Sequence, residues 1–217
     1  VMAAVILSFA AYRRNILWGD TYLMHMDNVN KAPNKSEPHN SLGTAYYNKG
    51  MIDIATQEYL TALRLNQNNE LAHNNLGLAY AELGRLQEAI EEYQKAIKLK
   101  PDLAQAHNNL GIAYAELGHL QEAIEEFQKA IRLKPDYALA YNNLGLAYSK
   151  QGQIDEGVKE FLMALKLKPD YAPAHNNLGF AYKTKGLNHE AKKEFEMVLK
   201  LNPNDATARQ VIESLEK

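Results

Sequence analysis

The chain has 217 residues and a net charge of −2, and 46% of its residues are hydrophobic. This is the composition of an ordinary soluble protein with enough apolar residues for a core. The near-neutral charge argues against nucleic-acid binding, which usually needs a basic face. The chain has no cysteine, which excludes disulfides and thiolate chemistry. Because it begins at Val1, we expect a fragment of a longer protein or a processed product.

The first predicted element is an apolar helix over residues 1–14, in which Ser8 is the one polar residue before Arg13 and Arg14. The apolar run is shorter than the roughly 20 residues that span a bilayer. It fits either the end of a severed membrane anchor, with the arginines at the interface, or a helix that caps the fold. A signal-peptide core is less consistent, because no convincing cleavage site is present.

Residues 15–35 follow as a degenerate half-repeat. Leu17, Trp18, Tyr22 and Val29 lie at spacings that allow a helix to pack on the next element. The prediction is a helical element over residues 15–31 that covers the first full repeat.

Residues 36–205 repeat with a period of 34 residues. The segment 73–80 returns at 107–114, 141–148 and 175–182, with a looser copy at 39–46. Glycines and prolines keep the same phase, at Gly50, Gly84, Gly118, Gly152, Gly186, Pro101, Pro135, Pro169 and Pro203. Such internal periodicity is the strongest signal in the chain. It defines five units over 36–69, 70–103, 104–137, 138–171 and 172–205.

Each unit predicts two antiparallel helices. In the second unit, apolar residues fall at helical spacing over 71–83 and again over 87–99. Gly84 permits the tight turn between them, and Pro101 ends the second helix. So short a helix pair cannot bury its apolar face alone, and neighbouring units must stack. The prediction is an all-α solenoid, with residues 206–217 as a capping helix whose Val211, Ile212 and Leu215 face inward.

The spacing of Leu76, Gly77, Tyr80, Ala89, Tyr93, Ala96 and Pro101 resembles the tetratricopeptide repeat, and the third unit has the same pattern. The resemblance covers residues 36–205. It implies a right-handed superhelix in which the first helix of each unit, helix A, lines a concave groove. One departure is Gly157, where the other units have Ala55, Ala89, Ala123 and Ala191. Glycine weakens a helix interior, so we expect alanine there to stabilise the protein by about 0.5–1 kcal/mol.

No enzymatic motif is present: the sequence lacks a Gly-rich phosphate loop, HExxH and Gly-x-Ser-x-Gly. We therefore expect a protein that is not an enzyme and has no cofactor. His39, His73, His107 and His175 share one repeat position. Equivalent positions on stacked helices lie about 8–10 Å apart, too far to share one zinc ion. We expect these histidines to pack on helix faces and no metal to bind.

Asparagine pairs recur in helix A, and their amides can donate to and accept from a peptide backbone. This resembles the asparagine ladder of the O-GlcNAc transferase superhelix, and the resemblance extends to Asn75, Asn109, Asn143 and Asn177. The alternative is that the amides tie neighbouring helices together. The same phase places further side chains in the groove. The candidate peptide-binding residues are Asn40, Asn74, Asn75, Asn108, Asn109, Asn142, Asn143, Asn176, Asn177, Leu78, Ile112, Leu146, Phe180, Lys150 and Lys183.

The leading functional prediction is a protein-interaction scaffold that binds an extended peptide or a partner helix in the concave groove. One alternative is the substrate-recruiting or regulatory arm of a larger membrane enzyme such as a glycosyltransferase. The segment around Arg14, Trp18 and Pro33 resembles the junction between membrane helices and repeats in glycosyltransferase-like proteins. The other alternative is a self-assembling structural module. We expect a cytoplasmic or membrane-tethered domain, with membrane association through residues 1–14.

Overall fold

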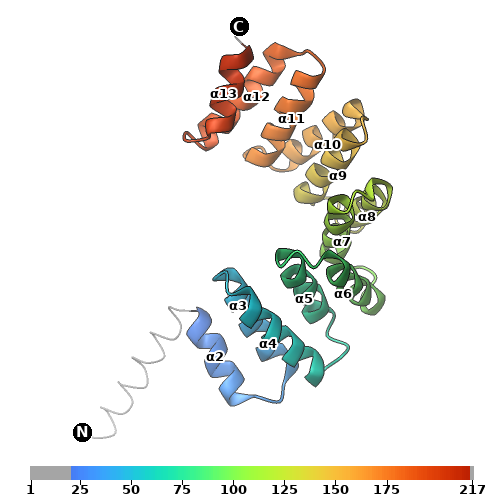
Figure 1. Cartoon of the computed structure of the whole chain (residues 1–217), viewed down its shortest axis with the longest axis vertical. Coiled ribbons are helices and arrows are strands. Elements are labelled where there is room, and N and C mark those ends of the chain that lie inside the picture. Colours follow the sequence, from blue (N-terminus) through green and yellow to red (C-terminus); the bar gives the residue numbers. More distant parts are fainter. Residues whose placement is uncertain (1–20, 216–217) are drawn as a thin grey trace, which may run out of the picture. The chain divides into compact units, whose positions relative to one another are not determined.

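The computed structural model describes residues 21–215, and every regular element in this range is an α-helix (Figure 1). The all-α prediction is confirmed. The helices are α2 (Thr21–Lys31), α3 (Ser36–Asn48), α4 (Ile52–Leu65), α5 (Glu70–Glu82), α6 (Leu86–Leu99), α7 (Ala104–Glu116), α8 (Leu120–Leu133), α9 (Ala138–Lys150), α10 (Ile154–Leu167), α11 (Ala172–Thr184), α12 (Asn188–Leu201) and α13 (Ala206–Leu215). They form two compact units, α2–α6 and α7–α13.

Each of the five predicted repeats is one helix pair, and the first and second helices are called A and B. The pairs are α3–α4, α5–α6, α7–α8, α9–α10 and α11–α12. Helix α2 packs on α3, as expected for the half-repeat. The predicted helix over residues 1–14, together with Leu17 and Trp18, lies outside the described residues. Between residues 21 and 215, no helix combines the length and apolar content needed to cross a bilayer.

The turn between the two helices of a repeat depends on glycine. Gly84 follows α5 with φ of +73°, a left-handed conformation that residues with a Cβ rarely adopt. Its N–H donates to the carbonyl of Ala81 at 2.9 Å, and the N–H of Arg85 donates to the carbonyl of Tyr80 at 2.8 Å. These bonds satisfy carbonyls that the end of α5 leaves without an intrahelical partner.

Helices A and B cross closely at a second glycine in each repeat. A Cβ built on Gly77 would lie 2.6 Å from the ring of Tyr93, which is 1% exposed. The other repeats place Gly43 against Tyr59, Gly111 against Phe127, Gly145 against Phe161 and Gly179 against Phe195, at 2.6–2.9 Å. The aromatic ring of helix B therefore fills the space that a side chain on helix A would need.

The last helix, α13, covers the end of unit α7–α13. Ala208 and Val211 are buried in one cluster with Phe195 and Val198 of α12, and Ile212 and Leu215 pack against this cluster. The sequence predicted a capping helix that turns Val211, Ile212 and Leu215 inward, and all three side chains lie in or against this cluster. A cap is required because the last repeat has no following neighbour to bury its apolar face.

A histidine of helix A is hydrogen-bonded to a glutamate of helix B in four of the five repeats. The pairs are His39–Glu58, His73–Glu92, His107–Glu126 and His175–Glu194, with Nδ1 to Oε2 distances of 2.5–2.6 Å. In three of them Nε2 lies 2.9–3.0 Å from a backbone carbonyl, of Pro33, Gln67 or Pro169. In these three repeats each ring nitrogen therefore faces a hydrogen-bond acceptor, which ties helix A both to helix B and to the preceding loop.

In the second and third repeats a lysine also donates to the glutamate, Lys95 to Glu92 at 2.7 Å and Lys129 to Glu126 at 2.6 Å. Burial opposes the ionisation of both carboxyls. The hydrogen bonds and charges of the histidine and the lysine outweigh it, so the pKa of Glu92 and that of Glu126 are lowered. The pairs thus connect helices A and B by charge-assisted hydrogen bonds.

We predict that Glu92→Gln lowers the free energy of unfolding by about 1–3 kcal/mol at pH 7, because it removes a charge-assisted acceptor at a partly buried site. Glu91→Gln is the matched control, since Glu91 is exposed on the same helix, and should change it by less than about 0.5 kcal/mol. Denaturant titration measures both. The pKa of Glu92 is lowered from 4.5, so this contribution is complete above about pH 4.5 and is lost as the pH falls through the lower value. Equal effects of the two substitutions would contradict this account.

The structure overturns the expectation for Gly157. A Cβ there would lie 2.3 Å from Oγ of Ser149 and 2.8 Å from the carbonyl oxygen of Gly145. The Ser149 hydroxyl donates to that same carbonyl at 2.9 Å. In the second and third repeats the residue at the position of Ser149 is Ala81 or Ala115, which has no hydroxyl. The fourth repeat thus combines serine on helix A with glycine on helix B.

We therefore predict that Gly157→Ala is neutral or destabilising by up to about 2 kcal/mol, because overpacking costs about 1–3 kcal/mol while the gain in helix propensity is about 1 kcal/mol. The double variant Ser149→Ala with Gly157→Ala reproduces the residue pair of the second and third repeats. It should be more stable than Gly157→Ala alone. Thermal melts of Gly157→Ala, Ser149→Ala and the double variant complete this double-mutant cycle. A higher melting temperature for Gly157→Ala alone would show that helices α9 and α10 separate easily.

Candidate functional site

The A helices of unit α7–α13 carry two adjoining surface hollows. The α9–α11 hollow has a volume of about 430 Å³ and is lined by Leu146, Ser149, Lys150, Ile154, Phe161, Asn177, Phe180, Ala181 and Thr184. The α7–α9 hollow, of about 180 Å³, is lined by Ile112, Ala115, Glu116, Phe127, Asn143, Leu146, Ala147 and Lys150. Leu146 and Lys150 line both. The two hollows therefore form one continuous candidate surface.

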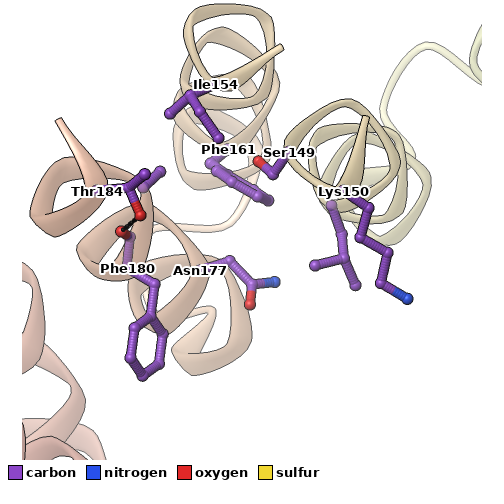
Figure 2. Close-up of a pocket in the computed structure, with 9 residues that line it drawn as sticks. Ser149, Lys150, Ile154, Phe161, Asn177, Phe180 and Thr184 are labelled. Carbon is purple, nitrogen blue, oxygen red and sulfur yellow. Dashed lines mark hydrogen bonds between the residues drawn. The ribbon is translucent and has the colours of Figure 1, made fainter. Parts of the chain in front are cut away.

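Helical periodicity explains why these residues meet. Leu146, Ser149 and Lys150 are spaced i, i+3 and i+4, which places them on one face of α9. Figure 2 shows Asn177 and Phe180 projecting from the facing helix α11, with Phe161 of α10 between the two helices. The close packing of α9 on α10 at Gly145 keeps Phe161 at the floor of the α9–α11 hollow.

The surface exposes large apolar side chains. Leu146 is 38% exposed and Phe180 is 39% exposed. The Phe180 ring packs edge-on against Phe195 of α12, with centroids 5.0 Å apart, so its orientation is fixed by the core. An exposed apolar side chain held in a hollow can gain free energy when a ligand covers it.

Charged residues flank the apolar floor. The exposed Lys150 lies between the two hollows, and the exposed Glu116 lines the α7–α9 hollow. A ligand that crosses this surface therefore meets a cation at its centre and an anion on one side. Such an arrangement favours a ligand of matching charge and one orientation over the reverse.

Six of the predicted contact residues are brought together here, and others are not. Leu146, Lys150, Asn177 and Phe180 line the α9–α11 hollow, and Ile112, Asn143, Leu146 and Lys150 line the α7–α9 hollow. Lys183 lines neither hollow, and its Nζ donates instead to Oγ of Ser214 on α13, at 3.3 Å. In unit α2–α6, Leu78 is partly buried, and Asn40 and Asn75 are hydrogen-bonded to each other.

The asparagines tie successive A helices together. Nδ2 of Asn75 donates to Oδ1 of Asn40 at 3.0 Å, Asn143 donates to Asn108 at 3.0 Å, and Asn177 donates to Asn142 at 2.9 Å. The first residue of the pair is buried in three repeats, at Asn74, Asn108 and Asn142. Asn109 and Asn176 are partly buried, and Oδ1 of Asn109 accepts from Asn108 at 3.4 Å. The alternative that the amides link neighbouring helices is therefore confirmed for these three contacts.

These contacts use the NH₂ groups of Asn143 and Asn177 and leave their side-chain oxygens available to a ligand. Among the described residues, none donates a hydrogen bond to Oδ1 of Asn143 or of Asn177. Each of these side chains thus keeps a free acceptor beside an apolar hollow. An amide oxygen in this position can accept from the backbone N–H of a ligand while its NH₂ group holds the neighbouring helix.

Sequence reasoning missed several residues of the hollows, namely Ser149, Ile154, Phe161, Ala181, Thr184, Ala115, Phe127 and Ala147. Ile154 could have been found from the sequence, because Ile52, Leu86 and Leu120 occupy the same position at the start of helix B. Phe161 and Phe127 belong to the buried core. They also line the hollows from below, although each ring is only 1% exposed.

Comparisons with known proteins agree with this architecture. A family model described as "TPR repeat" matches residues 43–84, 77–118, 113–152 and 148–186, and one described as "Tetratricopeptide repeat" matches residues 172–205. A search of curated proteins found no match. The resemblance to O-GlcNAc transferase and to membrane glycosyltransferases is not among these findings.

Solved structures share the fold. A chain of the APC/C hetero-tetramer Cut9–Hcn1 matches with a TM-score of 0.85 and 24% identity, over 92% of this chain and 40% of that chain. The present chain thus spans less than half of that relative. MamA matches with a TM-score of 0.65 and 33% identity, over 76% of this chain and 97% of that chain. YrrB, "a TPR protein with an unusual peptide-binding site", matches with a TM-score of 0.64 and 19% identity, over 87% and 97%.

The four matches of the first model end at the turn glycines Gly84, Gly118, Gly152 and Gly186, and the match of the second model is the fifth unit. The chain belongs to the tetratricopeptide repeat family.

Proposed function

We propose that this protein is a non-catalytic interaction scaffold that binds an extended peptide segment across the A helices α7, α9 and α11. The observation that supports this most is the continuity of two apolar hollows around Leu146 and Lys150. Both hollows are open at the surface, and their linings include the buried rings of Phe127 and Phe161. YrrB, which has the same fold, carries a peptide-binding site, and this is consistent with such a role for the fold.

The geometry indicates what the segment should look like. Packed helices lie about 8–10 Å apart, and an extended chain rises about 3.3 Å per residue, so successive A helices meet about every third residue. An apolar residue would occupy the α9–α11 hollow, and a second one, about three residues away, would occupy the α7–α9 hollow. Lys150 would favour an acidic residue between these two anchors. Oδ1 of Asn143 and of Asn177 would accept backbone N–H groups.

We predict that Leu146→Ala weakens the binding of peptides selected on this protein from a random library by about 5–30-fold, or about 1–2 kcal/mol, because Leu146 contributes apolar surface to both hollows. Leu162→Ala is the matched control, because Leu162 is an exposed leucine on α10, 47% exposed, that lines neither hollow. Lys150→Glu should shift the selected peptides from acidic to basic residues. Isothermal titration and sequencing of the selected pools measure these effects, and equal losses for Leu146→Ala and Leu162→Ala would contradict the proposed surface.

The asparagines allow a separate prediction. Asn143→Ala should lower the free energy of unfolding by about 1–3 kcal/mol, because it leaves Oδ1 of the fully buried Asn108 without its donor. Asn143→Asp keeps an acceptor and removes the NH₂ group, so it should destabilise the fold but retain more peptide affinity than alanine. Thermal melts and peptide titrations separate the two roles. An alanine variant with unchanged stability would show that the Asn143–Asn108 bond does not hold these helices.

A further inference from the structure

The fourth repeat lacks the histidine–glutamate pair that the other four repeats share. Its helix A carries Tyr141 where the others carry His39, His73, His107 or His175. Its helix B keeps the carboxylate, as Glu160, at the position of Glu58, Glu92, Glu126 and Glu194. The lysine that binds the glutamate in the second and third repeats is also replaced, by Met163. Glu160 therefore has neither the histidine nor the lysine that bind its counterparts.

A hollow of about 240 Å³ lies at this position, between α8, α9 and α10. Its lining is Gln128, Ile131, Arg132, Tyr141, Leu144, Tyr148 and Glu160. At about 30 Å³ per water molecule, this volume holds about eight waters, which is room for a side chain. We call it the Glu160 hollow.

The Glu160 hollow is distinct from the proposed peptide surface. On α9 it uses Tyr141, Leu144 and Tyr148, whereas the other two hollows use Leu146, Ser149 and Lys150. At 3.6 residues per turn these two sets point to roughly opposite sides of the helix. A ligand in the Glu160 hollow would leave the peptide surface accessible.

The chemistry of the lining is that of a receptor for a cation. Within residues 21–215, Glu160 forms no ion pair or side-chain hydrogen bond, and burial raises its pKa while the charge of Lys159 partly offsets this. Tyr141 and Tyr148 provide aromatic walls, and Ile131 and Leu144 provide apolar surface for an alkyl chain. The Tyr148 hydroxyl is fixed by a hydrogen bond from Nε2 of Gln128, at 3.0 Å.

We propose that the Glu160 hollow binds a lysine or arginine side chain of a partner protein, with the carboxylate of Glu160 as its counter-ion. The alkyl part of that side chain would lie on Ile131 and Leu144, and its charged end would take the place of the histidine of the other four repeats and of the lysine of the second and third repeats. The scaffold would then have two independent contact faces. One face would bind an extended segment across the A helices, and the other face would bind a single basic side chain.

Arg132 is the internal competitor. It is exposed and lines the same hollow, and in the structure it makes no ion pair with Glu160. If Arg132 folded back onto the carboxylate in solution, the hollow would be satisfied without a ligand. The experiment must therefore compare the wild-type protein with Arg132→Gln.

The test uses n-butylammonium and n-butylguanidinium as probes, with n-butanol as the neutral control, and follows the side-chain carboxyl carbon signals of the glutamates by NMR. We expect the wild-type protein to show a saturable shift of the Glu160 signal with both cations and none with butanol. Glu160→Gln should abolish probe-dependent shifts around the hollow. Tyr141→His should weaken binding at least tenfold, because it restores the internal pair. The relative affinities of the two probes identify the partner side chain. Tighter binding of n-butylammonium indicates lysine, and tighter binding of n-butylguanidinium indicates arginine.

Thermal stability provides an independent test of the unpaired state of Glu160. Glu160→Gln should raise the melting temperature at pH 7, since it removes a half-buried charge without a partner, whereas Glu92→Gln should lower it. The proposal is overturned if the cations do not shift the wild-type Glu160 signal, or if the shift persists around the hollow in Glu160→Gln. It is also overturned if binding is seen only in Arg132→Gln, because Arg132 would then be the natural occupant.

Discussion

The structure depends on one close contact, the crossing of helices A and B at a glycine that faces an aromatic ring. In every repeat the ring of Tyr59, Tyr93, Phe127, Phe161 or Phe195 occupies the place of the missing side chain. This contact sets the separation of the two helices and buries the largest side chains of the core. It also places the edges of Phe127 and Phe161 at the floor of the two hollows on the A helices. The binding surface that we propose is thus a direct consequence of how each repeat packs.

The repeats differ from one another in their buried polar contacts. The histidine–glutamate pairs join helices A and B within a repeat, and the asparagine pairs join helix A to the next helix A. Because each partner is at least partly buried, the loss of one leaves the other without its hydrogen bond, which costs more than the bond itself contributes. A repeat that replaces one partner of such a pair must therefore supply the other partner with a different hydrogen bond or charge. The fourth repeat changes Tyr141 and Met163 but keeps Glu160, and the carboxylate is left without an internal partner.

The fourth repeat differs in several ways that concentrate in one region. Ser149 lies so close to Gly157 that a Cβ there would be 2.3 Å from its hydroxyl oxygen, whereas the second and third repeats have alanine at both positions. Lys150 lies between the two hollows of the A helices, and Glu160 lines a hollow on the other side of α9. Repeats that only support their neighbours have no physical reason to keep an unpaired, half-buried carboxylate. The differences are consistent with a repeat in which contact with partners, and not maximum stability, determines the side chains.

The sequence by itself determined the fold class, the repeat boundaries, the turn glycines and the inward face of the last helix, because a 34-residue period repeats each local signal five times. It also assigned Leu146, Lys150, Asn177 and Phe180 to one groove, and these four side chains line one hollow. It did not identify the His73–Glu92 type of pair, the role of Asn75 as a donor to Asn40, or the cost of a methyl group at Gly157. These depend on distances between side chains 8, 19 or 35 positions apart on different helices, which periodicity does not encode. Only the packing of each helix on its neighbours decided which polar groups meet and where a hollow remains open.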